Sequence, residues 1–197
     1  MKVLAINSSP RPEGNTKALL QLVCKELNDQ GIDTEIYQLG GKLVHGCMAC
    51  RKCFENQDRK CVITGDCMNE LISKVFEADG LIIGSPTYFS NVTTELKAFI
   101  DRAGYVTLAN GNPLRRKAGA AVVAVRRAGS LPTFDAINHF YFITQMVIPG
   151  SSYWNIGIGR EQGEVLNDAE GIRTMETLGK NMAWLMHKLN GLPISEV

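Results

Sequence analysis

The sequence has no long hydrophobic run and no excess of one charge. Its longest unbroken apolar stretch is the eight residues 118–125, whereas a helix needs about 20 apolar residues to cross a membrane. Lysine and arginine together number 21, aspartate and glutamate number 20, and the net charge is +1. This near-neutrality argues against a dedicated nucleic-acid-binding protein, a polybasic membrane anchor and an acidic tail.

A secretory signal peptide is also missing. Polar Asn7 ends the first apolar run, residues 3–6, too early for a signal core. We therefore expect a cytoplasmic protein, and in that reducing compartment the six cysteines are not expected to form structural disulfides. Four of the six lie within residues 47–61. Such crowding in a cytosolic chain indicates metal or redox chemistry.

Several motifs that would assign a function are lacking. The loop after the first apolar run has neither the Lys-Ser/Thr ending of a P-loop nor the Gly-x-Gly-x-x-Gly of a dinucleotide site, so neither ATP nor a dinucleotide is expected there. Where a phospho-receiver domain needs acidic residues, the chain has Asn7, Ser8 and Ser9. No Ser–His–Asp set and no pair of carboxylates stands out, so hydrolysis has no support.

Short apolar runs alternate with amphipathic helical patterns along the chain. Continuous rather than alternating apolarity is typical of parallel strands that are covered on both faces. Two segments, 40–65 and 105–117, fit no regular element. The pattern predicts one doubly wound α/β domain over residues 1–197, with ligands at the carboxyl ends of its strands. We expect five strands, at residues 3–6, 34–39, 81–83 and 120–125 and within 151–158.

The loop after the first expected strand is rich in hydrogen-bond donors and leads into a helix. The N-terminus of a helix, with its free N–H groups, binds phosphate readily. Hydroxyl, amide and guanidinium donors are added by Ser8, Ser9, Arg11, Asn15 and Thr16. A small monophosphate fits this set, and FMN carries one. The same residues are also ordinary in a turn that caps a helix, and this loop alone does not separate the two interpretations.

A second loop, residues 84–93, follows the third expected strand and carries a proline-fixed turn with two adjacent aromatic residues, Tyr88 and Phe89. At the carboxyl end of a strand, such a loop can stack against a flat isoalloxazine and bond its polar edge. In isolation, core aromatics would be the commoner interpretation. The position beside the first loop, at the switch point of the sheet, favours the flavin.

Cys47, Cys50, Cys53 and Cys61 have the spacing C-x2-C-x2-C-x7-C. Thiolates at this spacing can surround one cubic iron–sulfur cluster, with the more distant fourth ligand closing it. Zinc is less favoured, because zinc sites usually place two pairs of ligands further apart. The remaining alternative is a set of free thiols that pack a loop, or a redox-labile pair.

Residues 7–16, 47–61 and 84–102 together resemble the NADPH-dependent FMN reductase family of flavodoxin-like proteins, and within it the iron–sulfur flavoproteins. The most specific part is the stretch GSPTYFSNV at 84–92, followed by LKAFIDR at 96–102. The resemblance covers about the first two thirds of the chain. It implies an α/β, flavodoxin-like three-layer sandwich with helices on both faces of a five-stranded parallel sheet of order 2-1-3-4-5.

The resemblance also implies how cofactors are held. It implies that the FMN phosphate lies on Ser9, Arg11, Asn15 and Thr16. It implies that the ring and the ribityl chain are held by Pro86, Thr87, Tyr88, Phe89 and Asn91. A [4Fe-4S] cluster in the compact cysteine motif is implied as well, with Cys47, Cys50, Cys53 and Cys61 as ligands. A homodimer or homotetramer, with flavins near subunit contacts, completes these expectations.

A basic loop, residues 126–130, follows the fourth expected strand. A positive charge near the flavin would stabilise its reduced anion, so Arg127, Ala128 and Gly129 join the expected flavin contacts. One basic group could instead receive the 2′-phosphate of NADPH. A solvated or interface-paired charge run is the commoner alternative.

Together these features predict an FMN-dependent oxidoreductase without a catalytic side chain, because the flavin carries the chemistry. NAD(P)H would give a hydride to the flavin, and electrons would pass to a quinone, a nitroaromatic, free flavin or a redox protein. One alternative is an electron carrier that relays electrons from ferredoxin through [4Fe-4S] and FMN without NAD(P)H. Another is a flavin-binding regulatory module without turnover. No nucleic-acid or membrane partner is expected.

Overall fold

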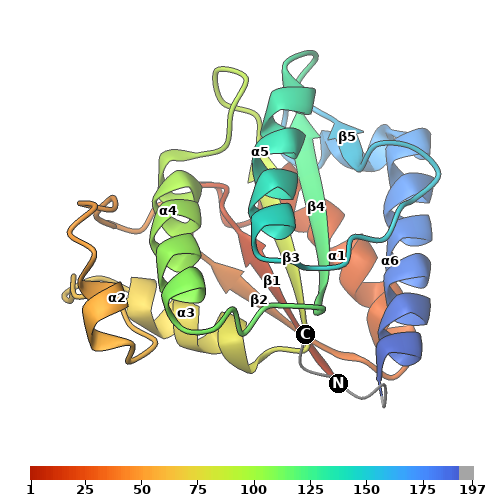
Figure 1. Cartoon of the computed structure of the whole chain (residues 1–197). Coiled ribbons are helices and arrows are strands. Elements are labelled where there is room, and N and C mark those ends of the chain that lie inside the picture. Colours follow the sequence, from red (N-terminus) through yellow and green to blue (C-terminus); the bar gives the residue numbers. More distant parts are fainter. Residues whose placement is uncertain (191–197) are drawn as a thin grey trace.

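Five parallel strands form the sheet at the centre of the fold (Figure 1). The computed structural model describes residues 1–190. Within them the strands stand in the order β2-β1-β3-β4-β5, which confirms the predicted order. The ends of β1, β3 and β4 reach the same edge, where Asn7 pairs with Gly84 and Pro86 pairs with Ala124. The strands are β1 (Lys2–Asn7), β2 (Asp33–Gln38), β3 (Gly80–Pro86), β4 (Ala118–Val125) and β5 (Ile156–Ile158).

Helices cover both faces of the sheet and complete the predicted three layers (Figure 1). α1 (Asn15–Asp29) and α6 (Ala169–Leu189) enclose one hydrophobic cluster with the sheet. α3 (Met68–Glu77), α4 (Thr94–Ala109) and α5 (Ser130–Ile143) enclose the other. Short α2 (Lys52–Asn56) and the 3-10 turn η1 (Glu164–Asn167) lie in connecting segments. No helix within residues 1–190 combines the length and the apolarity that crossing a membrane requires.

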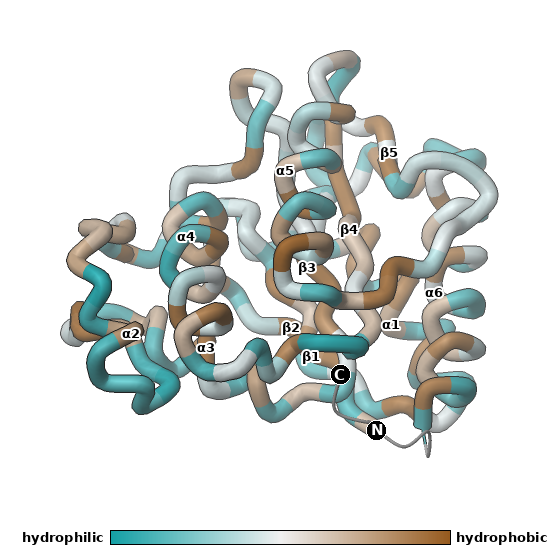
Figure 2. The backbone as a smooth tube through the Cα atoms, in the orientation of Figure 1, coloured by the Kyte–Doolittle hydropathy of each residue, from teal (hydrophilic) through white to brown (hydrophobic). Residues whose placement is uncertain are grey.

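The central strands form because their side chains are apolar toward both layers. All eight residues of β4 are buried, and Val3 and Leu4 of β1 lie in different clusters on opposite faces. Figure 2 shows hydrophobic residues along the centre of the fold and hydrophilic stretches in the segment around α2. Burial on two faces explains why these strands are continuous apolar runs.

Residues 105–109 differ from the prediction, because they continue α4 rather than form a loop. Val106 and Ala109 are buried and extend the apolar face of this helix. The helix ends at Ala109 with Asn110 as its C-cap residue, and Gly111 follows with a φ of 72°, a left-handed conformation that suits glycine. The predicted irregular segment 40–65 also contains one short helix, α2.

Candidate functional site

A cavity of about 300 Å³ lies at the carboxyl ends of the parallel strands. Its wall combines the loop after β1, the first turn of α1, the loop after β3 and the residues that follow β4 and β5. This is the edge where a doubly wound sheet binds its ligands. The cavity is termed the strand-end cavity and is lined by Ser9, Arg11, Gly14, Asn15, Thr16, Pro86, Thr87, Tyr88, Ala124, Val125, Arg126, Gly159 and Arg160.

The N-terminus of α1 opens into this cavity through Gly14, Asn15 and Thr16. Gly14 is the N-cap residue, and no side chain caps the first turn. The N–H groups of a first turn have no partner inside their own helix, and the helix dipole favours negative charge beside them. The strand-end cavity therefore offers a site for an anionic group such as a phosphate.

The loop after β1 is held in place from two sides. Gln38 at the end of β2 donates its Nε2 hydrogens to the carbonyl oxygens of Ser9, at 2.7 Å, and Gly40, at 2.8 Å. Thr93 donates its hydroxyl to the carbonyl oxygen of Ser8 at 3.1 Å. These bonds fix the backbone of the loop, so the donors in the cavity are preorganised.

Polar atoms in and near the cavity wall lack partners within the described chain. The hydroxyls of Ser8 and Thr87 are buried without a hydrogen bond, and Thr87 lines the cavity. Buried polar groups are nearly always satisfied, so such a hydroxyl indicates a polar ligand. The lining also holds Arg11, Arg126 and Arg160 but no acidic side chain. A ligand with an anionic group and polar substituents fits this wall, and FMN has both.

Seven of the twelve residues expected to contact flavin line the strand-end cavity: Ser9, Arg11, Asn15, Thr16, Pro86, Thr87 and Tyr88. Of the other five, Phe89 and Asn91 belong to a hairpin that follows β3. The N–H of Tyr88 donates to the carbonyl of Asn91 and the reverse bond also forms, both at 3.0 Å. Phe89, with a φ of 48°, is fully exposed at the tip. The structure thus places Phe89 outside the cavity lining.

The basic loop after β4 meets this hairpin beside the cavity. A Cβ on Gly129, which has a φ of +85°, would lie 2.5 Å from the Ser90 hydroxyl. Arg127 and Ala128 are exposed and outside the lining, whereas Arg126, the first residue after β4, lies in it. The structure therefore places Arg126 rather than Arg127 in the cavity wall.

Asn15, which the resemblance places at the FMN phosphate, lines the cavity and also makes two hydrogen bonds to the loop after β5. Its Nδ2 donates to the carbonyl of Glu161 at 2.9 Å, and its Oδ1 accepts from the N–H of Gly163 at 2.8 Å. Because both polar atoms are engaged, its side chain ties α1 to the loop after β5. That loop carries Arg160 into the cavity. Arg160 was missed by the sequence analysis, since β5 has only three residues and gave no sharp boundary.

Neighbouring arginines provide a direct test of the strand-end cavity. Arg126→Ala is expected to weaken FMN binding by about 1.5 kcal/mol, roughly tenfold, because it removes a charged donor from the wall. Arg127→Ala serves as the matched control and is expected to leave the dissociation constant unchanged. Fluorescence titration of the flavin-free protein with FMN measures both. Equal losses in the two variants would contradict this placement of the site.

A second, smaller hollow lies between the cysteine-rich segment and α4. It encloses about 20 Å³, and all four cysteines of the compact motif line it as free thiols. It is termed the cysteine hollow, and its lining is Cys47, Met48, Ala49, Cys50, Arg51, Cys53, Cys61, Val62, Ile63, Arg102, Tyr105 and Val106. The structure thus brings together the four cysteines that the sequence grouped by spacing.

The potential donors of the cysteine hollow are four thiols, the donor set that an iron–sulfur cluster requires. Within residues 1–190, no three His, Cys, Asp or Glu side chains are grouped closely enough to hold one metal ion. A cubic cluster differs, because each thiolate binds a different iron. Burial raises the pKa of Cys53, and the neighbouring thiols of Cys61 and Cys47 raise it further. The cysteine hollow encloses only about 20 Å³, so the cysteine-rich segment would have to open to admit a cluster.

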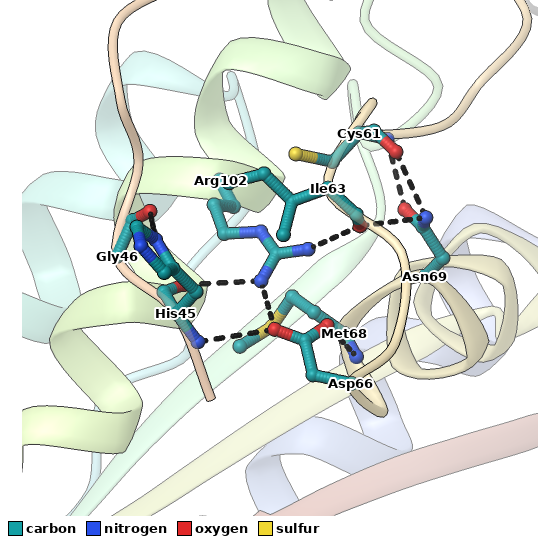
Figure 3. A network of polar contacts seen from close by, with 8 residues as sticks. All are labelled: His45, Gly46, Cys61, Ile63, Asp66, Met68, Asn69 and Arg102. Atoms are coloured by element: carbon teal, nitrogen blue, oxygen red, sulfur yellow. Dashed lines mark hydrogen bonds and ion pairs between the residues drawn. The ribbon is translucent and has the colours of Figure 1, made fainter. Parts of the chain in front are cut away.

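A buried ion pair supports one side of the cysteine hollow (Figure 3). The side chain of Arg102 on α4 is 0% exposed, and that of its partner Asp66 is 8% exposed. One terminal nitrogen of Arg102 donates to Asp66 Oδ2 at 2.5 Å and to the carbonyl of His45 at 3.0 Å. The other donates to the carbonyl of Ile63 at 2.9 Å. The sequence analysis did not assign a role to Arg102, because charged residues are usually exposed.

Two hydrogen bonds from Asn69 on α3 fix the backbone of Cys61. Its Oδ1 accepts from the N–H of Cys61 and its Nδ2 donates to the carbonyl of Cys61, both at 2.8 Å. Burial alone would raise the pKa of Asp66, but the Arg102 guanidinium and the N–H groups of His45 and Met68 hold that pKa below its usual range. Asp66 therefore stays ionised and keeps the pair intact at neutral pH.

A third cavity, of about 750 Å³, is a groove between α5 and the segment before β5. None of the residues singled out from the sequence for cofactor binding lines it. Phe134, His139 and Phe142 contribute its α5 side, and Tyr153 and Trp154 its other side. It shares no lining residue with the two sites described above.

The sequence model of the NADPH-dependent FMN reductase family matches residues 1–161. The chain belongs to this family. Its curated relatives include an iron–sulfur flavoprotein of Methanocaldococcus jannaschii, which is 38% identical over 190 residues and is matched over 93% of this chain and 96% of its own length. These matches confirm the resemblance carried by the loops and the cysteine motif. They make this family member an FMN-dependent oxidoreductase.

Solved structures confirm the flavodoxin-like fold. The crystal structure of RosB with bound 8-demethyl-8-formylriboflavin-5′-phosphate has a TM-score of 0.74 at 16% identity and covers 96% of this chain and 80% of RosB. The flavodoxin, WrbA-like protein from Agrobacterium tumefaciens has a TM-score of 0.67 at 12% identity, and the match covers 96% of this chain and 98% of that protein. The five-stranded sheet order seen in this family member agrees with that fold.

Proposed function

We propose that this family member is an iron–sulfur flavoprotein that transfers electrons between FMN in the strand-end cavity and a [4Fe-4S] cluster in the cysteine hollow. The observation that carries the proposal is the convergence of all four cysteines of the compact motif on one hollow. The relatives support it, because the M. jannaschii protein, which is similar over nearly its whole length, is an iron–sulfur flavoprotein by name.

Several groups of the strand-end cavity would hold FMN. The first turn of α1, with Ser9 and Arg11, would take the phosphate, and Thr87 would satisfy its unpartnered hydroxyl on a polar group of the cofactor. When bound, FMN accepts a hydride or single electrons and passes them on one or two at a time. The chain's own residues bind and orient this group, and no acid or base is required of them.

The four thiolates would hold the cluster. Cys61 is fixed by Asn69, and Cys53 lies at the second position of α2 and packs against the core. Cys50 is exposed, so the cysteine hollow is close to solvent. A cofactor near the surface can exchange electrons with another protein.

The surface around the cysteine hollow favours an acidic redox protein as that partner. Residues 47–61 carry four basic side chains, Arg51, Lys52, Arg59 and Lys60, and only two acidic ones. Exposed Met48 and Val62 belong to the lining of the cysteine hollow. Exposed apolar side chains together with charged ones are typical of transient protein interfaces, where charge complementarity speeds association. This arrangement favours the relay from a ferredoxin over a purely small-molecule reductase.

Charge reversal tests this interface. Arg59→Glu combined with Lys60→Glu is expected to slow reduction by an acidic ferredoxin about tenfold at low salt, with the difference shrinking as salt is added. Stopped-flow absorbance under anaerobic conditions measures the rate. Lys180→Glu combined with Lys188→Glu reverses two exposed charges on α6, on the opposite side of the molecule from α2 (Figure 1), and is the control. If neither the charge reversal nor the salt changes the rate of reduction, a docking site around the cysteine hollow would be contradicted.

A second candidate keeps NAD(P)H as the hydride donor and a quinone, nitroaromatic, free flavin or redox protein as the acceptor. It is favoured by the family's description and by the three arginines of the strand-end cavity, which suit an additional phosphate. The same stopped-flow instrument separates the two candidates. Reduction by NADPH within milliseconds to seconds, with no response to ferredoxin, would favour the reductase. Reduction by neither donor would favour a binding module without turnover.

A further inference from the structure

Arg102 joins the two ends of the cysteine-rich segment. The carbonyl of His45, which accepts from its guanidinium, lies two residues before Cys47, and the carbonyl of Ile63 lies two residues after Cys61. Asp66 then fixes the guanidinium itself and also accepts from the N–H of His45 at 3.0 Å. One buried side chain of α4 therefore sets the separation between the two arms that carry the cysteines (Figure 3).

One nitrogen of this guanidinium is left without a hydrogen-bond partner among the described residues. It is the Nε of Arg102, which is buried. Arg102 is part of the lining of the cysteine hollow, and the thiol of Cys61 is near enough to interact with it electrostatically. A buried charged donor without an acceptor is costly, so its natural acceptor is a negatively charged atom in the hollow.

We infer that Arg102 is the positioning residue of the cysteine site: it closes the segment around the four cysteines and its Nε–H donates to the sulfur of Cys61 when that sulfur is a cluster ligand. The inference rests on the proposed cluster. Arg102, the last residue of the LKAFIDR stretch, would thus contact the cofactor site as well as stabilise the fold.

The charges of Arg102 and Asp66 determine the direction in which each variant should shift the potential of the cluster. The potential of a cluster depends on its net charge and on hydrogen bonds to its sulfurs. The Nε–H of Arg102 favours the more negative, reduced form, and Asp66 offsets part of the positive charge beside it. Loss of the hydrogen bond should therefore lower the cluster potential, whereas loss of the Asp66 charge should raise it.

Two variants with opposite expected shifts form the test. Arg102→Lys keeps a positive charge but loses the planar fork and the Nε–H, while Asp66→Asn keeps Arg102 and removes the opposing charge. Anaerobic redox titration followed by electron paramagnetic resonance measures the potential, and transfer of iron to a chelator measures retention. We expect a lower potential and roughly 10–100-fold faster iron loss for Arg102→Lys. We expect a higher potential for Asp66→Asn.

A control variant and two distinct outcomes separate the role of Arg102 from the presence of the cluster itself. Lys97→Met, on the exposed face of the same helix where Lys97 pairs with Asp101, should change neither quantity. Wild-type protein that takes up no iron would overturn the cluster and the role of Arg102 together. A wild-type cluster whose potential is unmoved in both variants, or moves in the same direction in both, would overturn the inference alone. If Arg102→Lys does not fold, Asp66→Asn still decides through the sign of its shift.

Discussion

Replacing Gly40 by alanine is expected to abolish FMN binding and to lower the free energy of unfolding by about 3 kcal/mol. A Cβ at this position would lie 2.3 Å from the carbonyl oxygen of Ser8 and 2.3 Å from the carbonyl carbon and oxygen of Ser9. These atoms belong to the backbone of the loop after β1, which Gln38 holds by a hydrogen bond. The loop must therefore shift and take the donors of the strand-end cavity with it.

Urea denaturation and FMN titration measure the two effects of this substitution. Gly46→Ala is the matched control, because it lies in the same segment and its added Cβ would meet no atom within 4 Å. We expect its stability and FMN affinity to remain near those of the wild type. Full FMN binding by the Gly40→Ala variant would show that the close packing of Gly40 on the Ser8–Ser9 backbone is not required for the site.

Cys53→Ala is expected to reduce the iron content from about four per chain to near zero, because a cubic cluster loses one of its four thiolate ligands. Cys53 is half-buried, lines the cysteine hollow and packs against the core formed with α3, α4 and α5. FMN content should stay unchanged, since no cysteine lines the strand-end cavity. Iron and sulfide assays on protein purified without oxygen, together with its FMN content, measure this separation.

The chain supplies a close control for that substitution. Cys67 is also half-buried and packs against the same core, but it is outside the lining of the cysteine hollow. Cys67→Ala should keep its iron. Equal iron in Cys53→Ala and Cys67→Ala would demote the compact motif to a group of thiols that pack a loop.

The sequence was most informative where one physical requirement dominated. β1, β3 and β4 are buried on both faces, so their apolar runs were readable without knowledge of their neighbours. The four cysteines were grouped correctly because their spacing along the chain is short. The helical character of residues 105–109 was missed, since the burial of Val106 depends on the cysteine-rich segment, whose hollow it lines.

Which side chains lie at the edges of the two sites could be determined only from the tertiary structure. Nothing local distinguishes Arg126 from Arg127, yet the last residues of β4 fix which of them enters the cavity. The burial of Arg102 depends on acceptors that come from His45, Ile63 and Asp66, remote in the sequence. The bonds of Asn15 to the loop near Gly163 likewise depend on residues remote in the sequence. Long-range polar partners are not encoded in a local pattern.

The absorption spectrum of protein purified without oxygen tests the central claim most directly. We expect the two visible bands of oxidised flavin on a broad absorption from an iron–sulfur cluster, with FMN released on denaturation. Flavin bands without the broad absorption would leave the strand-end cavity as assigned and remove the cluster. A spectrum with no flavin bands, and none regained after incubation with FMN, would contradict the account.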